Sequence, residues 1–231
     1  MRNLTENRII KFIRDNSGYF GIIAAISVTI STLISLLLHS SIDPSFNIAS
    51  HVISDLGTGP DISSIVYTTG LIINSFSQYP LFFSIRNYLH KKEGSAYLIK
   101  YTTPMFLISI ISHNILSLVP FERNLLPLFL THGITAAIHY VAGSISLILY
   151  GFIELLTTKV SKILVAISFI AGTFYGLLWI GYLIYFTVGI PQESINYSLQ
   201  WIALAGVIIW MLLHGIFIIK TKKRELDKTK I

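Results

Sequence analysis

A polar segment between two long apolar stretches carries the side chains best suited to chemistry. Residues 41–62 read SIDPSFNIASHVISDLGTGPDI and contain one histidine, three aspartates and no Lys or Arg. An Asp-Pro start and a glycine stop predict a short helix over residues 44–56. On such a helix His51 and Asp55 share one face, because they are four positions apart. A carboxylate that orients an imidazole suits a general base or a metal ligand. A pair that only fixes the loop fits the same spacing.

Three further histidines lie near one predicted level of the membrane. His132 opens an apolar stretch, and His139 follows two helical turns deeper on the same face. At roughly 1.5 Å per residue, His113 and His139 both lie about 9–10 Å below the outer boundary. Consecutive helices joined by a short loop are antiparallel neighbours, so these two rings can meet. His214 lies near the inner end of the last stretch, at another level.

Two hypotheses treat these histidines as part of the bundle interior or of a cavity. In the first, each buried ring hydrogen-bonds a nearby Ser, Thr or Asn and does no chemistry. In the second, an outward-facing polar cavity binds a lipid headgroup or a metal, or performs hydrolysis. Its metal ligands would be His51, Asp55, His113 and His132. Its catalytic residues would be His51, Asp55 and His132, with Glu122 or Glu193 as further lining residues.

Two other hypotheses need a cofactor or a path through the bundle. Haem b would be held by two axial histidines, for which His113 and His139 are the candidates. A small transporter or permease would need a continuous polar path. Glu154 is the only acidic residue within the predicted spans, near an inner end, so an ion-coupled pump lacks its usual buried carboxylate. The sequence leaves the cofactor, and whether the protein is an enzyme, open.

The composition is that of a membrane protein. Of the 231 residues, 53% are hydrophobic and 12% charged, against roughly 25% charged in soluble domains. The absence of Cys excludes disulfides, thiolate metal sites and Cys nucleophiles. No H-E-x-x-H, G-x-S-x-G, S-x-x-K or Walker pattern is present. The net charge of +6 does not predict nucleic-acid binding, because the basic residues flank apolar stretches.

Six stretches are long enough to cross a bilayer, which takes about 20 apolar residues. They predict an all-α fold, a six-span transmembrane bundle at residues 18–219. The expected spans are residues 18–38, 63–85, 98–119, 132–155, 163–188 and 199–219. A basic segment at 1–17 precedes them and a basic tail at 220–231 follows. The first stretch lacks an A-x-A cleavage site, so we expect it to be retained as a helix.

The distribution of Lys and Arg predicts the orientation. Sixteen of the 17 lie in the two terminal segments and in the second and fourth loops with their flanks, and one, Arg123, lies in the third loop. By the positive-inside rule both termini are cytoplasmic, residues 41–62 face outside, and the plasma membrane is the expected location. The basic tail would lie beside anionic lipid headgroups. An oligomer is compatible with this arrangement.

Several of these features occur together in a pattern that resembles a known family. They are an H-V-I-S-D-L-G segment after the first span, a Pro and an acid after the third, and a His that opens the fourth. In this chain they are His51, Ser54, Asp55, Leu56, Gly57, Pro120, Glu122 and His132. The pattern resembles the domain-of-unknown-function 998 family of prokaryotic six-helix integral membrane proteins, over most of the chain. Val52 departs from it, since Pro is expected there. The resemblance implies a six-span bundle with polar residues at the outer face, and no established reaction.

Overall fold

The structure is a computed structural model that describes residues 8–92, 95–122, 124–157, 159–188 and 196–228. Within these ranges every regular element is a helix, which confirms the predicted all-α class. The elements are α1 (Arg8–Asp15), α2 (Ser17–Ile42), η1 (Ile53–Thr58), α3 (Asp61–Lys91), α4 (Ala96–Leu118), α5 (Leu126–Leu156), α6 (Lys162–Val188) and α7 (Asn196–Lys228).

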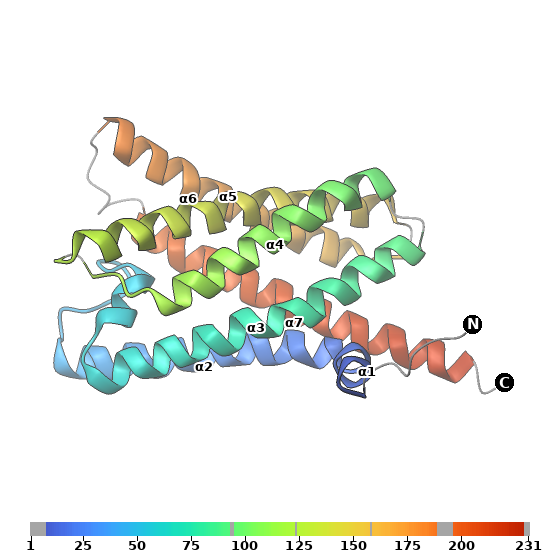
Figure 1. Ribbon diagram of the computed structural model, residues 1–231, viewed down its shortest axis with the longest axis horizontal. Helices are drawn as coiled ribbons and strands as arrows, with labels where there is room; N and C mark the ends of the chain where they lie inside the picture. The colour runs from blue at the N-terminus through green and yellow to red at the C-terminus, as the bar shows by residue number, and fades with distance from the viewer. Residues whose placement is uncertain (1–7, 93–94, 123, 158, 189–195, 229–231) are drawn as a thin grey trace.

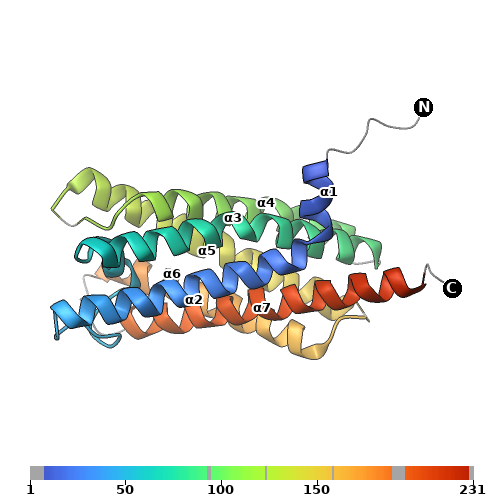
Figure 2. The same cartoon turned by 90° about the horizontal axis from the view of Figure 1, so that it is seen from below.

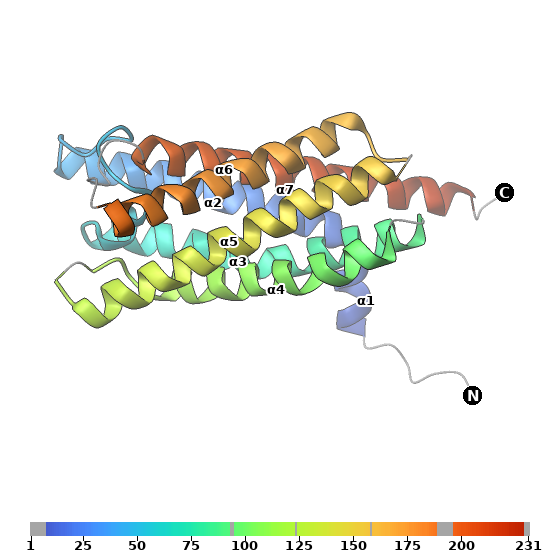
Figure 3. The same ribbon diagram turned by 90° about the horizontal axis from the view of Figure 1, so that it is seen from above.

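The six long helices, α2 to α7, run side by side along the long axis of the molecule (Figure 1). Neighbours in the sequence pack together, and α7 returns to pack on α2, which closes the bundle (Figure 3). The short helix α1 crosses the end of the bundle at which the last turns of α7 also lie (Figure 2). The 3-10 helix η1 and the connection between α4 and α5 lie at the opposite end (Figure 1).

Four helices in the described part of the chain are long and apolar enough to cross a membrane. They are Ser17–Ile42, Leu126–Leu156, Lys162–Ile184 and Tyr197–Asp227, in α2, α5, α6 and α7. These helices identify the chain as a helical membrane protein. The remaining two long helices, α3 and α4, do not meet this requirement; α3 includes Asn74 and Gln78, and α4 includes Lys100 and His113.

In the middle of α3, polar side chains face the protein interior and apolar side chains on the opposite face are exposed. Asn74 and Gln78 are buried, whereas Ile73 and Phe76 are exposed. Asn74 Nδ2 donates to the Ala24 carbonyl of α2 at 2.8 Å, and Gln78 Nε2 donates to Asn74 Oδ1 at 2.8 Å. Asn74 thus links α3 to α2, and Gln78, whose amide also lies 3.2 Å from His113 Nδ1, links α3 to α4. This distribution suits a helix whose outer face meets lipid.

Small residues bring α2 and α7 into backbone contact. A Cβ added at Gly215 would lie 2.7 Å from the Gly18 carbonyl oxygen, and one at Gly18 would lie 2.6 Å from the Gly215 carbonyl oxygen. Neither position has room for a larger side chain. The close approach is the small-residue packing by which helices associate in lipid, where no hydrophobic force drives them together.

The α-helix predicted over residues 44–56 is wrong. Turns follow α2, and only residues 53–58 are helical, as the 3-10 helix η1. Asp43 ends α2 instead of starting a new helix, because its backbone N–H donates to the His39 carbonyl. Its carboxylate accepts hydrogen bonds from the N–H and hydroxyl of Ser45, which hold the pKa of Asp43 below its ordinary value. The side chain thus turns the chain back.

Candidate functional site

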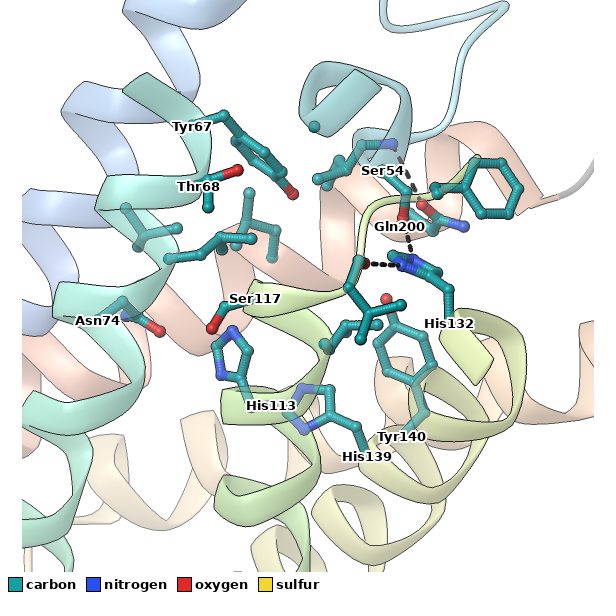
Figure 4. Close-up of a pocket in the computed structure, with 18 of the residues that line it drawn as sticks. Ser54, Tyr67, Thr68, Asn74, His113, Ser117, His132, His139, Tyr140 and Gln200 are labelled. Atoms are coloured by element: carbon teal, nitrogen blue, oxygen red, sulfur yellow. Dashed lines mark hydrogen bonds between the residues drawn. The ribbon is translucent and has the colours of Figure 1, made fainter. Parts of the chain in front are cut away.

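A cavity of about 290 Å³ lies beneath η1, between the ends of α3, α4, α5 and α7 that are nearest to η1 (Figure 4). This volume is near the lower end of the range usual for small-molecule sites. Three of the predicted site residues, His113, His132 and His139, line it. Its apolar wall includes Leu71, Leu116, Leu204, Val207 and Met211, and its other polar residues include Ser54, Tyr67, Thr68, Asn74, Ser117, Tyr140, Tyr175 and Gln200.

His132 joins η1 to α5 at this cavity. Its Nδ1 lies 2.8 Å from the Val119 carbonyl oxygen, and its Nε2 lies 3.1 Å from the Ser54 hydroxyl (Figure 4). A carbonyl only accepts, so Nδ1 carries the proton. In the neutral ring Nε2 is then the acceptor, and the Ser54 hydroxyl donates to it. A serine hydroxyl is thereby paired with an oriented imidazole, the arrangement that activates a nucleophile.

Contacts to α7 hold η1 over the cavity. The backbone N–H of Ile53 donates to Gln200 Oε1 at 3.2 Å, and Gln200 Nε2 donates to the Tyr182 hydroxyl at 2.9 Å. The Trp201 indole N–H donates to the His51 carbonyl oxygen at 3.2 Å. Leu56 of η1 is fully buried in a small apolar cluster. The segment is therefore held in place as a cover of this end of the bundle.

The structure places His113 and His139 side by side, with ring centroids 4.8 Å apart and planes tilted by 38° (Figure 4). His139 Nδ1 lies 2.9 Å from the Ser109 carbonyl oxygen, so this nitrogen is the donor. Its Nε2 then accepts from the Tyr175 hydroxyl at 3.2 Å. Both nitrogens of His139 are therefore engaged by protein groups.

This pair does not suit the predicted axial ligation of haem b. Two imidazoles that hold one metal from opposite sides each place a nitrogen about 2 Å from it, with the cofactor between the rings. In the structure the rings of His113 and His139 contact each other, which leaves no space for a porphyrin between them. His139 also lacks a nitrogen that is not already hydrogen-bonded.

His113 presents a donor to the cavity. Gln78 Nε2 donates to His113 Nδ1 at 3.2 Å, since the same amide nitrogen also donates to the Asn74 side-chain oxygen. The proton of the neutral ring therefore lies on Nε2. Within the described residues no protein acceptor is found for Nε2. The hydroxyl of Tyr67 also points toward the cavity (Figure 4).

The cavity wall is uncharged. Among the described residues that line it there is no Lys, Arg, Asp or Glu. An ion placed there would lose its hydration without gaining a charged partner. The loss would cost on the order of several kcal/mol of binding free energy. The wall instead combines N–H and O–H donors with a large apolar area.

His51 and Asp55, predicted as the centre of the site, do not line the cavity. His51 lies in the turns before η1, where its ring packs against Phe46 with centroids 4.5 Å apart and Nδ1 lies 2.9 Å from the Ser50 hydroxyl. Asp55 accepts the backbone N–H of Val52 at 3.2 Å at the start of η1. The two residues are not aligned on one α-helical face, because the α-helix that would align them does not form.

The predicted metal ligands are not brought together. Among the described residues no group of three or more His, Cys, Asp or Glu side chains has the geometry to hold a metal ion. Glu122 accepts the Asn124 backbone N–H at 3.2 Å in the turn between α4 and α5 and does not line the cavity. Glu193 and Arg123 lie outside the described residues.

Sequence reasoning missed several residues of this site. Ser54 appeared only as part of the motif that resembles a family, and Gln200 was not singled out. Neither has a spacing that points to its partner, since the partners lie on distant helices. Comparisons of the chain with models of known protein families, with curated proteins and with solved structures gave no match. The resemblance to the domain-of-unknown-function 998 family therefore stays a prediction.

Proposed function

We propose that this chain is a six-span plasma-membrane protein with both termini in the cytoplasm, and that its outer cavity binds an uncharged, oxygen-bearing amphipathic molecule such as a diacylglycerol. The observation that carries the proposal is the cavity wall, which combines hydrogen-bond donors with apolar side chains and carries no charge. Membership of the domain-of-unknown-function 998 family, which the motif at His51–Gly57 suggests, agrees with a six-span bundle.

Two observations support six spans. The outward-facing side chains of α3 and α4 include Ile73, Phe76, Ile108 and Ile111, so both helices present apolar surface where lipid would lie. Both are also long enough to cross a bilayer, since α3 has 31 residues and α4 has 23. The orientation rests on the positive-inside rule. Basic side chains of α1, and of the last turns of α7, lie at the end of the bundle away from η1 (Figure 1).

The donors of the cavity select the chemistry of the ligand. The Nε2–H of His113 and the hydroxyl of Tyr67 can each donate to an ester, carbonyl or hydroxyl oxygen. The apolar wall formed by Leu71, Leu204 and Val207 suits an acyl chain. A phosphate would enter without a Lys or Arg to neutralise it. The lipid headgroup that fits is therefore an uncharged one.

Binding of a fluorescent diacylglycerol to the full-length protein in nanodiscs tests this proposal. We expect saturable binding, and about a tenfold rise in Kd for His113→Phe, because one buried hydrogen bond to the ligand is lost. The matched control is His90→Phe, since His90 is exposed near the opposite end of α3. It should leave Kd unchanged.

Phosphatidate with the same acyl chains can be tested as a competitor for diacylglycerol binding. This competition separates the effect of headgroup charge on binding from the effect of the acyl chains. We expect phosphatidate to compete weakly. Equal competition by phosphatidate, or an unchanged Kd in His113→Phe, would show that the cavity does not select an uncharged head through its donors.

The Ser54–His132 pair favours a second candidate function, hydrolysis of an ester held in the same cavity. The Ser54 oxygen would attack the ester carbonyl carbon while His132 Nε2 takes the hydroxyl proton and passes it to the departing alcohol. Water would then release the acyl group from Ser54. An organophosphorus probe for activated serines tests this candidate.

A further inference from the structure

A second polar cluster lies in the inner half of the bundle, away from the cavity. Glu154 of α5 and His214 of α7 form a bond of 2.7 Å between Oε1 and Nε2, and each side chain is 1% exposed. The other carboxylate oxygen of Glu154 accepts from the Ser168 hydroxyl of α6 at 2.8 Å. The Trp210 indole N–H donates to that same hydroxyl oxygen at 2.9 Å. Three helices therefore meet at one carboxylate.

The partners of this cluster fix the position of every proton except one. His214 Nδ1 lies 2.8 Å from the Trp210 carbonyl oxygen, so Nδ1 is a donor. Ser168 receives the indole N–H and gives its own proton to Glu154. One proton remains, between Glu154 Oε1 and His214 Nε2. It makes the pair either carboxylic acid and neutral imidazole or carboxylate and imidazolium, and in both cases the pair has no net charge.

Loss of this proton would leave a carboxylate that faces an imidazole lone pair, in an apolar surrounding. Tyr150, one turn earlier on α5, interacts electrostatically with Glu154 and with Arg86 of α3. The guanidinium of Arg86 is bonded to Thr103 and Asn87. Phe106 of α4 supplies an apolar ring against Trp210. A single buried negative charge would thus be poorly compensated.

The pair also joins helices that otherwise pack on other neighbours. α5 packs mainly on α4 and α6, whereas α7 packs mainly on α2 and α6. Loss of the proton would therefore weaken the contact between α5 and α7, and few other contacts join these two helices. The cluster corrects the expectation that the chain lacks a buried carboxylate. It also shows that His214, expected to stand apart from the other histidines, has a specific acidic partner.

We propose that Glu154 and His214 form a binding site for a single proton that the protein takes up and releases, separate from the outer cavity. Proton-coupled membrane proteins use buried acid and histidine side chains of this kind. This inference does not depend on the outer cavity binding a ligand. If the protein is a small transporter or permease, this pair is the protonatable group that coupling to protons would need.

Glu154→Gln is a matched probe of this site, because its amide reproduces the protonated pair. The amide N–H₂ can donate to His214 Nε2 and the amide oxygen can accept from Ser168, so the variant should fold. In infrared difference spectra of the full-length protein between acidic and alkaline buffer, we expect one coupled carboxyl and imidazole change that Glu154→Gln lacks. The control Glu225→Gln, at an exposed position near the end of α7, should keep it.

Thermal unfolding gives an independent measurement. We expect the melting temperature of the unaltered protein to fall on the order of 5–10 °C over the same change to alkaline buffer, because an uncompensated buried charge is created. Glu154→Gln should not show this fall. If Glu154→Gln keeps the coupled spectral change, or if its melting temperature follows pH as the unaltered protein does, then the pair does not bind and release a proton.

Discussion

The Ser54 hydroxyl and the imidazole of His132 meet although 78 positions separate them in the chain. The imidazole is oriented by a backbone carbonyl rather than by a carboxylate, since Nδ1 donates to Val119. Asp55, the neighbour of Ser54, instead caps the first turn of η1. Of the predicted catalytic residues, only His132 therefore lines the cavity, where Ser54 joins it as a candidate nucleophile, while His51 and Asp55 lie outside.

A fluorophosphonate probe decides whether Ser54 is an activated nucleophile. If it is, the Ser54 oxygen displaces fluoride, His132 takes the proton, and a stable adduct forms. We expect labelling of the protein in nanodiscs that Ser54→Ala abolishes and that His132→Gln reduces at least about a hundredfold, in keeping with general base catalysis. The adduct is located by mass spectrometry of peptides.

Ser45→Ala provides the control, because Ser45 is exposed in the same outer segment and is bonded to Asp43. It should be labelled as the unaltered protein is. The Ser50 hydroxyl lies 2.9 Å from His51 Nδ1. An adduct on Ser50 would therefore indicate that the predicted His51, and not His132, acts as the base. Absence of any adduct would leave Ser54 a structural partner of His132 and remove hydrolysis as a candidate.

At the scale of the elements, glycines decide which helices contact closely. Gly18 and Gly215 place α2 against α7, and this contact closes the ring of helices. We expect Gly215→Ala to lower the free energy of unfolding by about 1–3 kcal/mol, because the new methyl group forces the two backbones apart. The measurement is reversible unfolding of the purified protein with a denaturing detergent.

Gly133→Ala is the matched control on α5, where an added Cβ meets nothing within 4 Å. It should leave the free energy of unfolding unchanged or raise it by up to about 1 kcal/mol, since alanine favours a helix more than glycine does. If both substitutions change stability equally, the contact between Gly18 and Gly215 does not limit the packing of α2 on α7.

η1 shows why the outer segment was difficult to predict at the scale of elements. The spacing of Ile48, Val52 and Leu56 suggests an amphipathic α-helix, but Ile48 is 50% exposed while Leu56 is fully buried. Hydrogen bonds from α7 to the backbone of His51 and Ile53 replace those that an α-helix would make. Tertiary contacts therefore override the local pattern in this short segment.

On the scale of the whole molecule, η1 lies at one end of the bundle, and α1 with the last turns of α7 lies at the other (Figure 1). The chain contains no Cys, so single cysteines can be introduced to report which end faces outside. We expect Ala49→Cys to react with a membrane-impermeant maleimide in intact cells. Lys223→Cys should react only after the cells are opened, because the proposed orientation places the basic end in the cytoplasm.

Both positions are exposed in the structure, so access within the folded protein does not limit either reaction. The unaltered chain is the blank for labelling, since it has no thiol. Reaction of Lys223→Cys in intact cells with protection of Ala49→Cys would reverse the proposed orientation. Reaction of both in intact cells would contradict an even number of spans.

The helical class and the approximate extent of the long helices could be predicted because each depends on local composition. Apolar stretches of sufficient length must form helices in lipid, where every backbone polar group needs an internal partner. The depth of His113 and His139 followed from counting residues along those helices, and their rings do lie together. The same counting could not show that Ser109 and Tyr175 occupy both nitrogens of His139.

The sequence alone determined the helical class and the apolar stretches typical of a membrane protein, because hydropathy and helical periodicity act along the chain. Only the tertiary structure decided which side chains face one another. It paired Ser54 with His132 and Glu154 with His214, and left His51 and Asp55 outside the cavity. The physical reason is that rotation of each helix is set by close contacts with distant segments, such as that of Gly18 with Gly215, and not by the local pattern.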